Sequence, residues 1–329
     1  MHMKGKALLF AIVMGILVPS LMYGMVKNML PQPNLVPITP TEETIPDNYI
    51  DSPQATESIT VPVILPQGVV QTMDMDTYLV GVLLGEMPAE FATEALKAQA
   101  VVARTYALKR ATTGKKHIID GVCTEPGCCQ AYCDPNKYLS QGGKAEDVQK
   151  IKNAVVETTG LVLLYDNKLI DATYYSCSGG KTEDALAVWG TDIPYLQAVE
   201  SPGEENASHY QDTIIYSVDD FANMLHITTG KPSSWIGAYT YTRGGGVDTV
   251  YIAGKKYQGT TLRSLFKLPS TAFYITIEGK TVKITTRGFG HRVGMSQYGA
   301  EAMAVAGKGF ESILSHYYPG TCLETYRQN

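Results

Sequence analysis

The chain has 329 residues, of which 44% are hydrophobic and 18% charged, so it can bury a sizeable core and is not globally disordered. A net charge of −5 and the absence of a basic stretch argue against nucleic-acid binding, which needs cations to neutralise phosphates. Tyrosine is abundant, with 21 residues against 7 phenylalanines. Its ring can stack on a sugar while its hydroxyl forms hydrogen bonds, so the composition suits a carbohydrate groove, although it also suits β-sheet surfaces.

The N-terminal region predicts a membrane anchor. Residues 1–6 contain Lys4 and Lys6, and the apolar run 7–26 carries no charge before Lys27, which is close to the length of a bilayer span. Lysines before the run favour a cytoplasmic N-terminus and export of the residues C-terminal to the run. A cleaved signal peptide is the alternative, but no A-x-A site follows the apolar core. We therefore expect a single-pass protein of the cell membrane with its body outside the cytoplasm.

A tether is expected between the anchor and the folded domain. Residues 27–58 contain six prolines among polar residues and show little apolar periodicity, as in an extended linker. Alternating apolar residues then indicate a strand at Ile59, Val61, Val63 and Leu65. We place the folded domain at 59–329.

The first candidate functional residue follows an apolar segment, 76–84, that is predicted to form a short helix or a turn. Glu86 stands in the run Val82-Leu83-Leu84-Gly85-Glu86-Met87-Pro88. Desolvation disfavours an ionised carboxyl group and raises its pKa, the condition under which it can donate a proton near neutral pH. The structural alternative is a partly exposed glutamate at a helix end.

The rest of the chain mixes helices and strands. Apolar spacing predicts a helix over 93–111 that contains Arg104, either in a structural ion pair or as a substrate clamp. Further strands and a helical pattern are expected at 161–165 and 169–175 around the turn Asp166-Asn167, at 249–252, at 273–286 with a turn at Glu278-Gly279, and at 296–317. Without regular βαβ alternation, these elements predict an α+β fold in one elongated domain.

The cysteines are unevenly spaced and allow two interpretations. Cys123, Cys128, Cys129 and Cys133 form a cluster that follows His117, whereas Cys177 and Cys322 lie apart. An even number of cysteines in an exported protein usually means disulfides. Alternatively, His117 and Cys123 with one of the adjacent pair supply three ligands for zinc, and the equal six-residue gaps favour Cys129 over Cys128.

Three stretches, in this order, carry a family resemblance. They are Gly85–Pro88 with Glu94–Tyr106; Ser178–Glu183 with Val188-Trp189 and Pro194–Leu196; and Gly288–Ala300 with Ile313–Thr321. Over about residues 59 to 325 the chain closely resembles the stage II sporulation protein D family, the engulfment lytic transglycosylases of endospore-forming bacteria. The predicted anchor and proline-rich tether are also features of that family.

The resemblance implies that 59–329 is an extracytoplasmic catalytic domain that cleaves peptidoglycan glycan strands stripped of stem peptides. The family's catalytic glutamate maps onto Glu86, which would protonate the glycosidic oxygen and then act as the base for the C6 hydroxyl of the same muramic acid ring. Because that nucleophile is already in place, a second carboxylate is not obligatory. The implied partners are the amidase stage II sporulation protein P and the membrane protein stage II sporulation protein M.

The resemblance also implies substrate-binding residues at Arg104, Ser178, Tyr195, His291, Gln297 and Tyr298, each of which could instead be a buried polar residue that holds a loop. Arg292 departs from the family pattern, which predicts a small residue at this position. The cysteine cluster is no general family feature, so any zinc would order a loop near Glu86 and is not required for the chemistry.

Three functions therefore remain open. The leading one is a membrane-anchored lytic transglycosylase. The second is a non-catalytic cell-wall module that enhances a partner amidase, a name that related proteins carry. The third is a zinc-dependent hydrolase built on the His117 cluster.

Overall fold

The computed structural model describes residues 59–113, 117 and 119–327, all within the compact unit Ala55–Asn329. The predicted anchor (7–26) and linker (27–58) lie outside the described residues. Among the residues that are described, no helix combines the length and hydrophobicity of a bilayer span. The expected mixture of helices and strands is confirmed, but the strands form several small sheets and the apolar residues form two separate cores.

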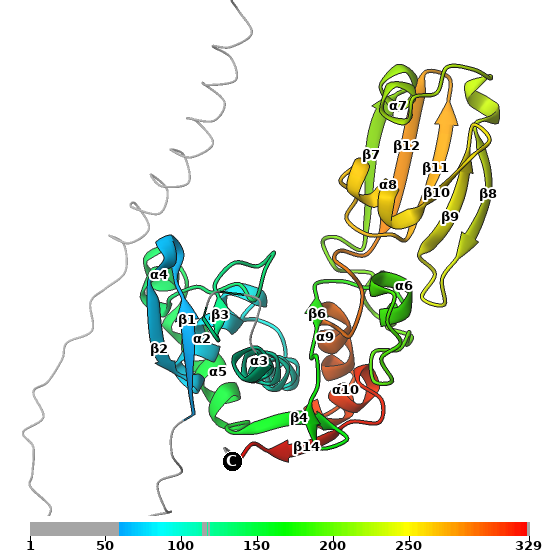
Figure 1. Cartoon of the computed structure of the whole chain (residues 1–329). Coiled ribbons are helices and arrows are strands. Elements are labelled where there is room, and N and C mark those ends of the chain that lie inside the picture. Colours follow the sequence, from blue (N-terminus) through cyan, green and yellow to red (C-terminus); the bar gives the residue numbers. More distant parts are fainter. Residues whose placement is uncertain (1–58, 114–116, 118, 328–329) are drawn as a thin grey trace, which may run out of the picture. The chain divides into compact units, whose positions relative to one another are not determined.

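The first core contains elements from both ends of the described chain (Figure 1). They are β1 (Thr60–Ile64), β2 (Val70–Asp74), α2 (Met75–Glu86), α3 (Thr93–Thr113), β3 (Val122–Cys123), α4 (Pro135–Ser140), α5 (Ala145–Val156), β4 (Leu161–Tyr165), β5 (Lys168–Leu169), β6 (Tyr174–Tyr175), α6 (Ala185–Trp189), β13 (Met295–Ser296), α9 (Gln297–Val305), α10 (Phe310–Tyr317) and β14 (Cys322–Thr325). A 3₁₀ turn, η1 (Pro66–Gly68), joins β1 to β2.

The central element of this core is α3, which confirms the helix predicted over 93–111. Its residues from Ala95 to Leu108 are almost all buried, and it packs against α2, α5, α9, α10 and β4. A helix that is surrounded on all sides buries even its polar residues. The alanine-rich sequence permits this because small side chains allow neighbouring helices to approach closely.

Two predicted elements are interrupted in the structure. The strand expected at 169–175 is reduced to β5 and β6, because Tyr174 and Tyr175 pair in parallel with Met295 and Ser296 of β13. The helical pattern at 296–317 is split into α9 and α10. Gly307, with φ +82°, takes the left-handed conformation that ends α9.

The second core is formed by residues 211–287, inserted between α6 and β13 of the first core. Its elements are β7 (Gln211–Ser217), α7 (Val218–Leu225), η2 (Pro232–Ser234), β8 (Ile236–Tyr241), β9 (Val247–Ile252), β10 (Lys255–Gln258), α8 (Gly259–Leu265), β11 (Phe273–Glu278) and β12 (Thr281–Arg287). They form two antiparallel sheets with the strand orders β10-β9-β8 and β11-β12-β7. The strand predicted at 249–252 lies within β9, and the hairpin predicted at 273–286 is β11–β12.

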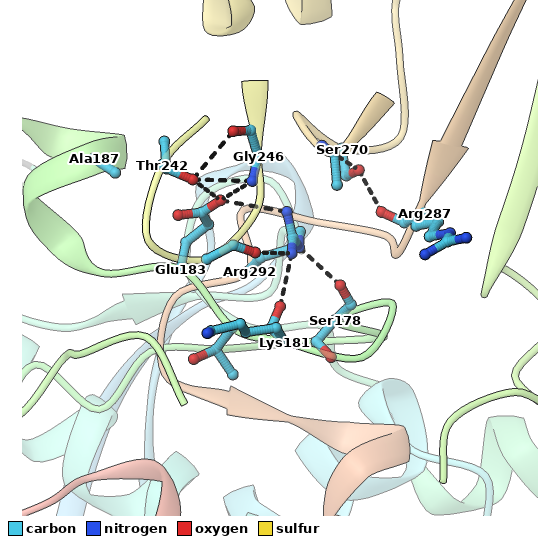
Figure 2. Close-up of polar contacts among 12 residues, drawn as sticks. Ser178, Lys181, Glu183, Ala187, Thr242, Gly246, Ser270, Arg287 and Arg292 are labelled. Carbon is cyan, nitrogen blue, oxygen red and sulfur yellow. Dashed lines mark hydrogen bonds and ion pairs between the residues drawn. The ribbon is translucent and has the colours of Figure 1, made fainter. Parts of the chain in front are cut away.

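A buried arginine links the loops of the first core to the second core (Figure 2). Arg292 donates from Nε to the Ser178 carbonyl at 2.8 Å and from Nη2 to the Lys181 and Gly244 carbonyls at 2.7 and 2.8 Å. Its Nη1 lies 3.4 Å from Oε1 of Glu183. The family pattern predicts a small residue at position 292. In this protein the long side chain of Arg292 fills a buried junction instead.

Candidate functional site

Glu86 lies in a cleft of about 610 Å³ in the first core. The cleft is lined by Glu86, Tyr106, Arg110, Pro126, Gly127, Cys128, Cys129, Thr173, Tyr174, Tyr175, Ser176, Trp189, Phe289, Gly290, His291 and Gln297. The cleft therefore contains Glu86, His291, Gln297 and Cys129 of the predicted site. Among the described residues that line it, Glu86 carries the only carboxyl group.

The environment of Glu86 stabilises its protonated form. Glu86 is the last residue of α2, where the Met87 N–H donates to the Leu83 carbonyl and the chain then becomes extended before Pro88. Burial raises the pKa of the Glu86 carboxyl, and this outweighs the opposite effects of the Ala131 N–H, Tyr174 and Gln297. The Ala131 N–H donates to Oε1 at 2.5 Å. The predicted upward shift of the pKa is confirmed.

A chain of polar side chains orients Tyr174 beside the carboxyl group. The Tyr78 hydroxyl donates to Oε1 of Gln130 at 3.1 Å, and Nε2 of Gln130 donates to the Tyr174 hydroxyl at 3.0 Å. Because Tyr174 accepts from Gln130, its own proton is free to point toward Glu86. Burial raises the pKa of Tyr174 well above its ordinary value, so the hydroxyl keeps this proton. Sequence patterns did not single out Tyr174 or Ala131, because neither lies near Glu86 in the chain.

Gln297 and His291 face the same cleft from the C-terminal part of the chain. Gln297 opens α9 after the N-cap Ser296, and its buried side-chain amide opposes the rise in the pKa of Glu86. Nδ1 of His291 accepts from the Val293 N–H at 3.1 Å. Burial, with Arg263 as a second cause, lowers the pKa of His291 to about 4, so the imidazole is neutral near pH 7.

His117 and the nearby cysteines lie together at the edge of this cleft. The ligand atoms of His117, Cys123, Cys128 and Cys129 all lie within 4.8 Å of one another. Contrary to expectation, the adjacent cysteines both belong to the cluster. Their N–H groups both donate to the Glu125 carbonyl at 2.9 Å, and this tight turn brings the two sulfurs to one side. Three cysteines and one histidine are a standard tetrahedral set for zinc.

Comparisons with known proteins identify the family. Residues 66–165 match the family model described as "Stage II sporulation protein". The chain is 39% identical over 256 residues to stage II sporulation protein D of Bacillus amyloliquefaciens. The alignment covers 76% of this chain and 74% of that protein. The chain belongs to the stage II sporulation protein D family. The Bacillus subtilis (strain 168) member is 37% identical over 261 residues, covering 77% of this chain and 75% of that protein.

A second kind of relative is the amidase enhancer of Bacillus subtilis (strain 168). It is 33% identical over an alignment of 306 residues. The alignment covers 75% of this chain and 40% of the relative. The family-model match contains Glu86, Arg104 and the His/Cys cluster, whereas His291 and Gln297 lie beyond it.

The other predicted substrate-binding residues do not line the cleft. Arg104 is 0% exposed and donates from Nη2 to Asp76 at 2.9 Å and from Nη1 to the Leu161 carbonyl at 3.3 Å. This placement favours the structural ion pair over the substrate clamp. The positive charge of Arg104 can be buried because the Asp76 carboxylate pairs with it.

Ser178, Tyr195 and Tyr298 also have internal partners. The Ser178 hydroxyl donates to the buried Glu204 at 2.8 Å. The Tyr195 hydroxyl accepts from the Asp171 N–H at 3.2 Å. The Tyr298 ring packs edge-on against Phe91. These three side chains therefore make contacts within the protein and do not line the cleft.

Proposed function

We propose that this protein is a lytic transglycosylase that cleaves peptidoglycan glycan strands during sporulation. The observation that carries the proposal is the solitary, desolvated carboxyl group of Glu86 in the cleft. Ordinary glycoside hydrolysis uses two carboxyl groups. A reaction in which the substrate supplies its own nucleophile needs only one.

In the proposed reaction, protonated Glu86 donates its proton to the glycosidic oxygen as the bond from C1 of muramic acid to that oxygen breaks. The Glu86 carboxylate then takes the proton of the C6 hydroxyl of the same ring while O6 attacks C1. A new C1–O6 bond closes the 1,6-anhydro ring, and Glu86 is again protonated for the next cycle. The Ala131 N–H holds the carboxylate formed between the two proton transfers, because it donates to Oε1.

A structural zinc ion on His117, Cys123, Cys128 and Cys129 belongs to the same proposal. The Ala131 N–H that bonds Glu86 lies two residues after Cys129. A metal ion that fixes this turn would therefore hold the donor in place, with no part in the bond-breaking step.

We place the reaction outside the cytoplasm, at the cell membrane, with residues 7–26 as the anchor. The amidase enhancer relative supports a link to cell-wall amidases, and the partners proposed are stage II sporulation proteins P and M. Removal of stem peptides by an amidase would expose the glycan strands on which this site acts.

The deciding experiment is product analysis by mass spectrometry of purified protein with glycan strands stripped of stem peptides. We expect 1,6-anhydromuramic acid ends from the wild type and from Glu90→Gln, a control at an exposed carboxylate, and none from Glu86→Gln. The same products from wild type and Glu86→Gln would remove Glu86 from the mechanism.

The second candidate function, enhancement of an amidase, is favoured by the amidase enhancer relative. It is tested by adding the protein to a cell-wall amidase. Stimulation of the amidase without anhydro products would establish this second function in place of the first. Full glycan cleavage in the presence of a chelator would exclude a zinc-dependent hydrolase.

A further inference from the structure

Two exposed aromatic rings lie on the same cleft as Glu86. Trp189 is 45% exposed and Phe289 is 43% exposed. Among the described residues, they are the two large, exposed apolar side chains that line the cleft. Single exposed apolar residues are common on protein surfaces. Two aromatic rings in one polar-lined cleft point instead to a ligand with apolar faces and polar edges.

The backbone holds Phe289 in a fixed position. Its N–H donates to the Cys177 carbonyl at 2.7 Å, and its carbonyl accepts from the Cys177 N–H at 3.4 Å. It is flanked by Gly288 and Gly290, with φ of +77° and +113°. A Cβ on Gly288 would lie 2.6 Å from the Ser178 carbonyl oxygen, so this side of the loop fits only a glycine.

Each of the two rings is supported by a histidine. The Phe289 ring lies 4.7 Å from the ring of His209. Trp189 is the last residue of α6, which ends at Gly190 in the left-handed conformation, and its indole lies 5.5 Å from the His291 ring. His291 in turn packs edge-on against Tyr175 at 5.4 Å. The two rings are therefore held before any ligand arrives, which reduces the entropy lost on binding.

We propose that Trp189 and Phe289 are two stacking platforms that bind pyranose rings of the glycan strand in the Glu86 cleft. The ligand class is a β-1,4-linked chain of N-acetylated amino sugars, whose C–H faces pack on aromatic rings while their hydroxyl and amide groups bond polar neighbours. The buried amide of Gln297, which lines the cleft, is one such polar partner. The identity of the glycan rests on the proposed function, whereas the stacking itself does not depend on catalysis.

The proposal is tested by binding to full-length protein that carries Glu86→Gln, so that the probe is not cleaved. The probes are chito-oligosaccharides and glycan strands without stem peptides, and the readout is isothermal titration calorimetry. We expect Trp189→Ala and Phe289→Ala each to weaken binding about tenfold, and Trp189→Phe and Phe289→Tyr to retain most of the affinity. All four substitutions should leave the unfolding temperature nearly unchanged, because both rings are exposed.

The matched control is Tyr274→Ala, an exposed aromatic residue on β11 that does not line the cleft, and it should bind like its parent. In the otherwise wild-type protein, the two alanine substitutions should raise KM more than they change kcat. The platforms are refuted if the alanine variants bind like the parent, if Tyr274→Ala weakens binding equally, or if the parent binds no glycan at all.

Failure of the proposed function gives a different result. A wild-type protein that produces no anhydro ends, yet binds glycan through Trp189 and Phe289, would retain the platforms and lose the catalytic assignment. If the wild-type protein cleaves glycan normally and the alanine variants bind glycan with unchanged affinity, the catalytic assignment is retained and the stacking platforms are refuted.

Discussion

At the scale of single residues, Glu86 illustrates how burial and hydrogen bonding compete. The Ala131 N–H, Tyr174 and Gln297 all stabilise the carboxylate, but burial has the larger effect and the pKa is raised. The position at the end of α2 acts in the same direction, because the carbonyl groups of a helix C-terminus repel negative charge. The residue is thereby suited to donate a proton first and to hold the resulting charge afterwards.

This balance predicts the effect of pH on stability. The raised pKa means that the folded protein binds the Glu86 proton more tightly than the unfolded chain does, so this contribution to stability is complete at low pH and is lost as pH rises through the folded pKa. Glu86→Gln should therefore unfold at a higher denaturant concentration than wild type at pH 7, and the difference should vanish below about pH 4. Urea unfolding at several pH values measures this, and a constant difference across the range would contradict it.

At the scale of elements, glycines on α2 set the distance to the segment that follows the His/Cys cluster. A Cβ on Gly85 would lie 2.9 Å from the Tyr132 nitrogen, and one on Gly81 would lie 2.2 Å from the Tyr132 ring. The Cys133 N–H also donates to the Gly81 carbonyl at 2.9 Å. The segment that follows the His/Cys cluster thus packs directly on the helix that ends at Glu86.

Removal of the proposed zinc ion is predicted to loosen this segment without unfolding the domain. We expect about one equivalent of zinc in wild-type protein by elemental analysis. Cys123→Ser should lose most of this zinc and show faster amide hydrogen exchange in 119–133, with reduced glycan cleavage. Cys322→Ser, at an exposed cysteine far along the chain from the cluster, should retain the metal. Metal-free wild-type protein with full protection of 119–133 would rule out the structural role.

At the scale of the whole described domain, the Arg292 junction joins two hydrophobic cores. Glu183 receives hydrogen bonds from the Thr242 hydroxyl at 2.7 Å and from the Gly246 N–H at 2.8 Å, in addition to its contact with Arg292. Arg292 has φ +66°, which is uncommon for a residue with a side chain. The same backbone segment carries Phe289 and His291 into the cleft, so the junction and the site share one loop.

Loss of the arginine is predicted to be severe because it leaves a buried charge unpaired. Arg292→Ala should lower the free energy of unfolding by about 3–5 kcal/mol, whereas Arg287→Ala, at an exposed position nearby in the chain, should change it by no more than about 0.5 kcal/mol. Adding Glu183→Gln to Arg292→Ala should recover part of the loss, since the unpaired charge is then removed. Chemical denaturation of the four proteins provides the comparison, and a loss below about 1 kcal/mol in Arg292→Ala would show that the junction is not essential.

The sequence alone determined the features that depend on neighbours in the chain. Apolar spacing identified α3 and the β11–β12 hairpin, and the apolar run around Glu86 indicated its raised pKa. The cysteine spacing allowed either disulfides or a metal site, and it pointed to three of the four residues that lie together in the His/Cys cluster. Ordered motifs were enough for the family, because they extend over most of the chain.

Only the tertiary structure decided which polar residues face the cleft. Ala131 lies 45 residues from Glu86, and the Ser178 carbonyl lies 114 residues from its donor Arg292. The residue types of Arg104, Ser178 and Tyr195 do not reveal whether each side chain binds a substrate or an internal partner. In the folded protein all three have internal partners. Local patterns report burial and periodicity, whereas the direction of a polar side chain depends on which distant segment supplies its hydrogen bond.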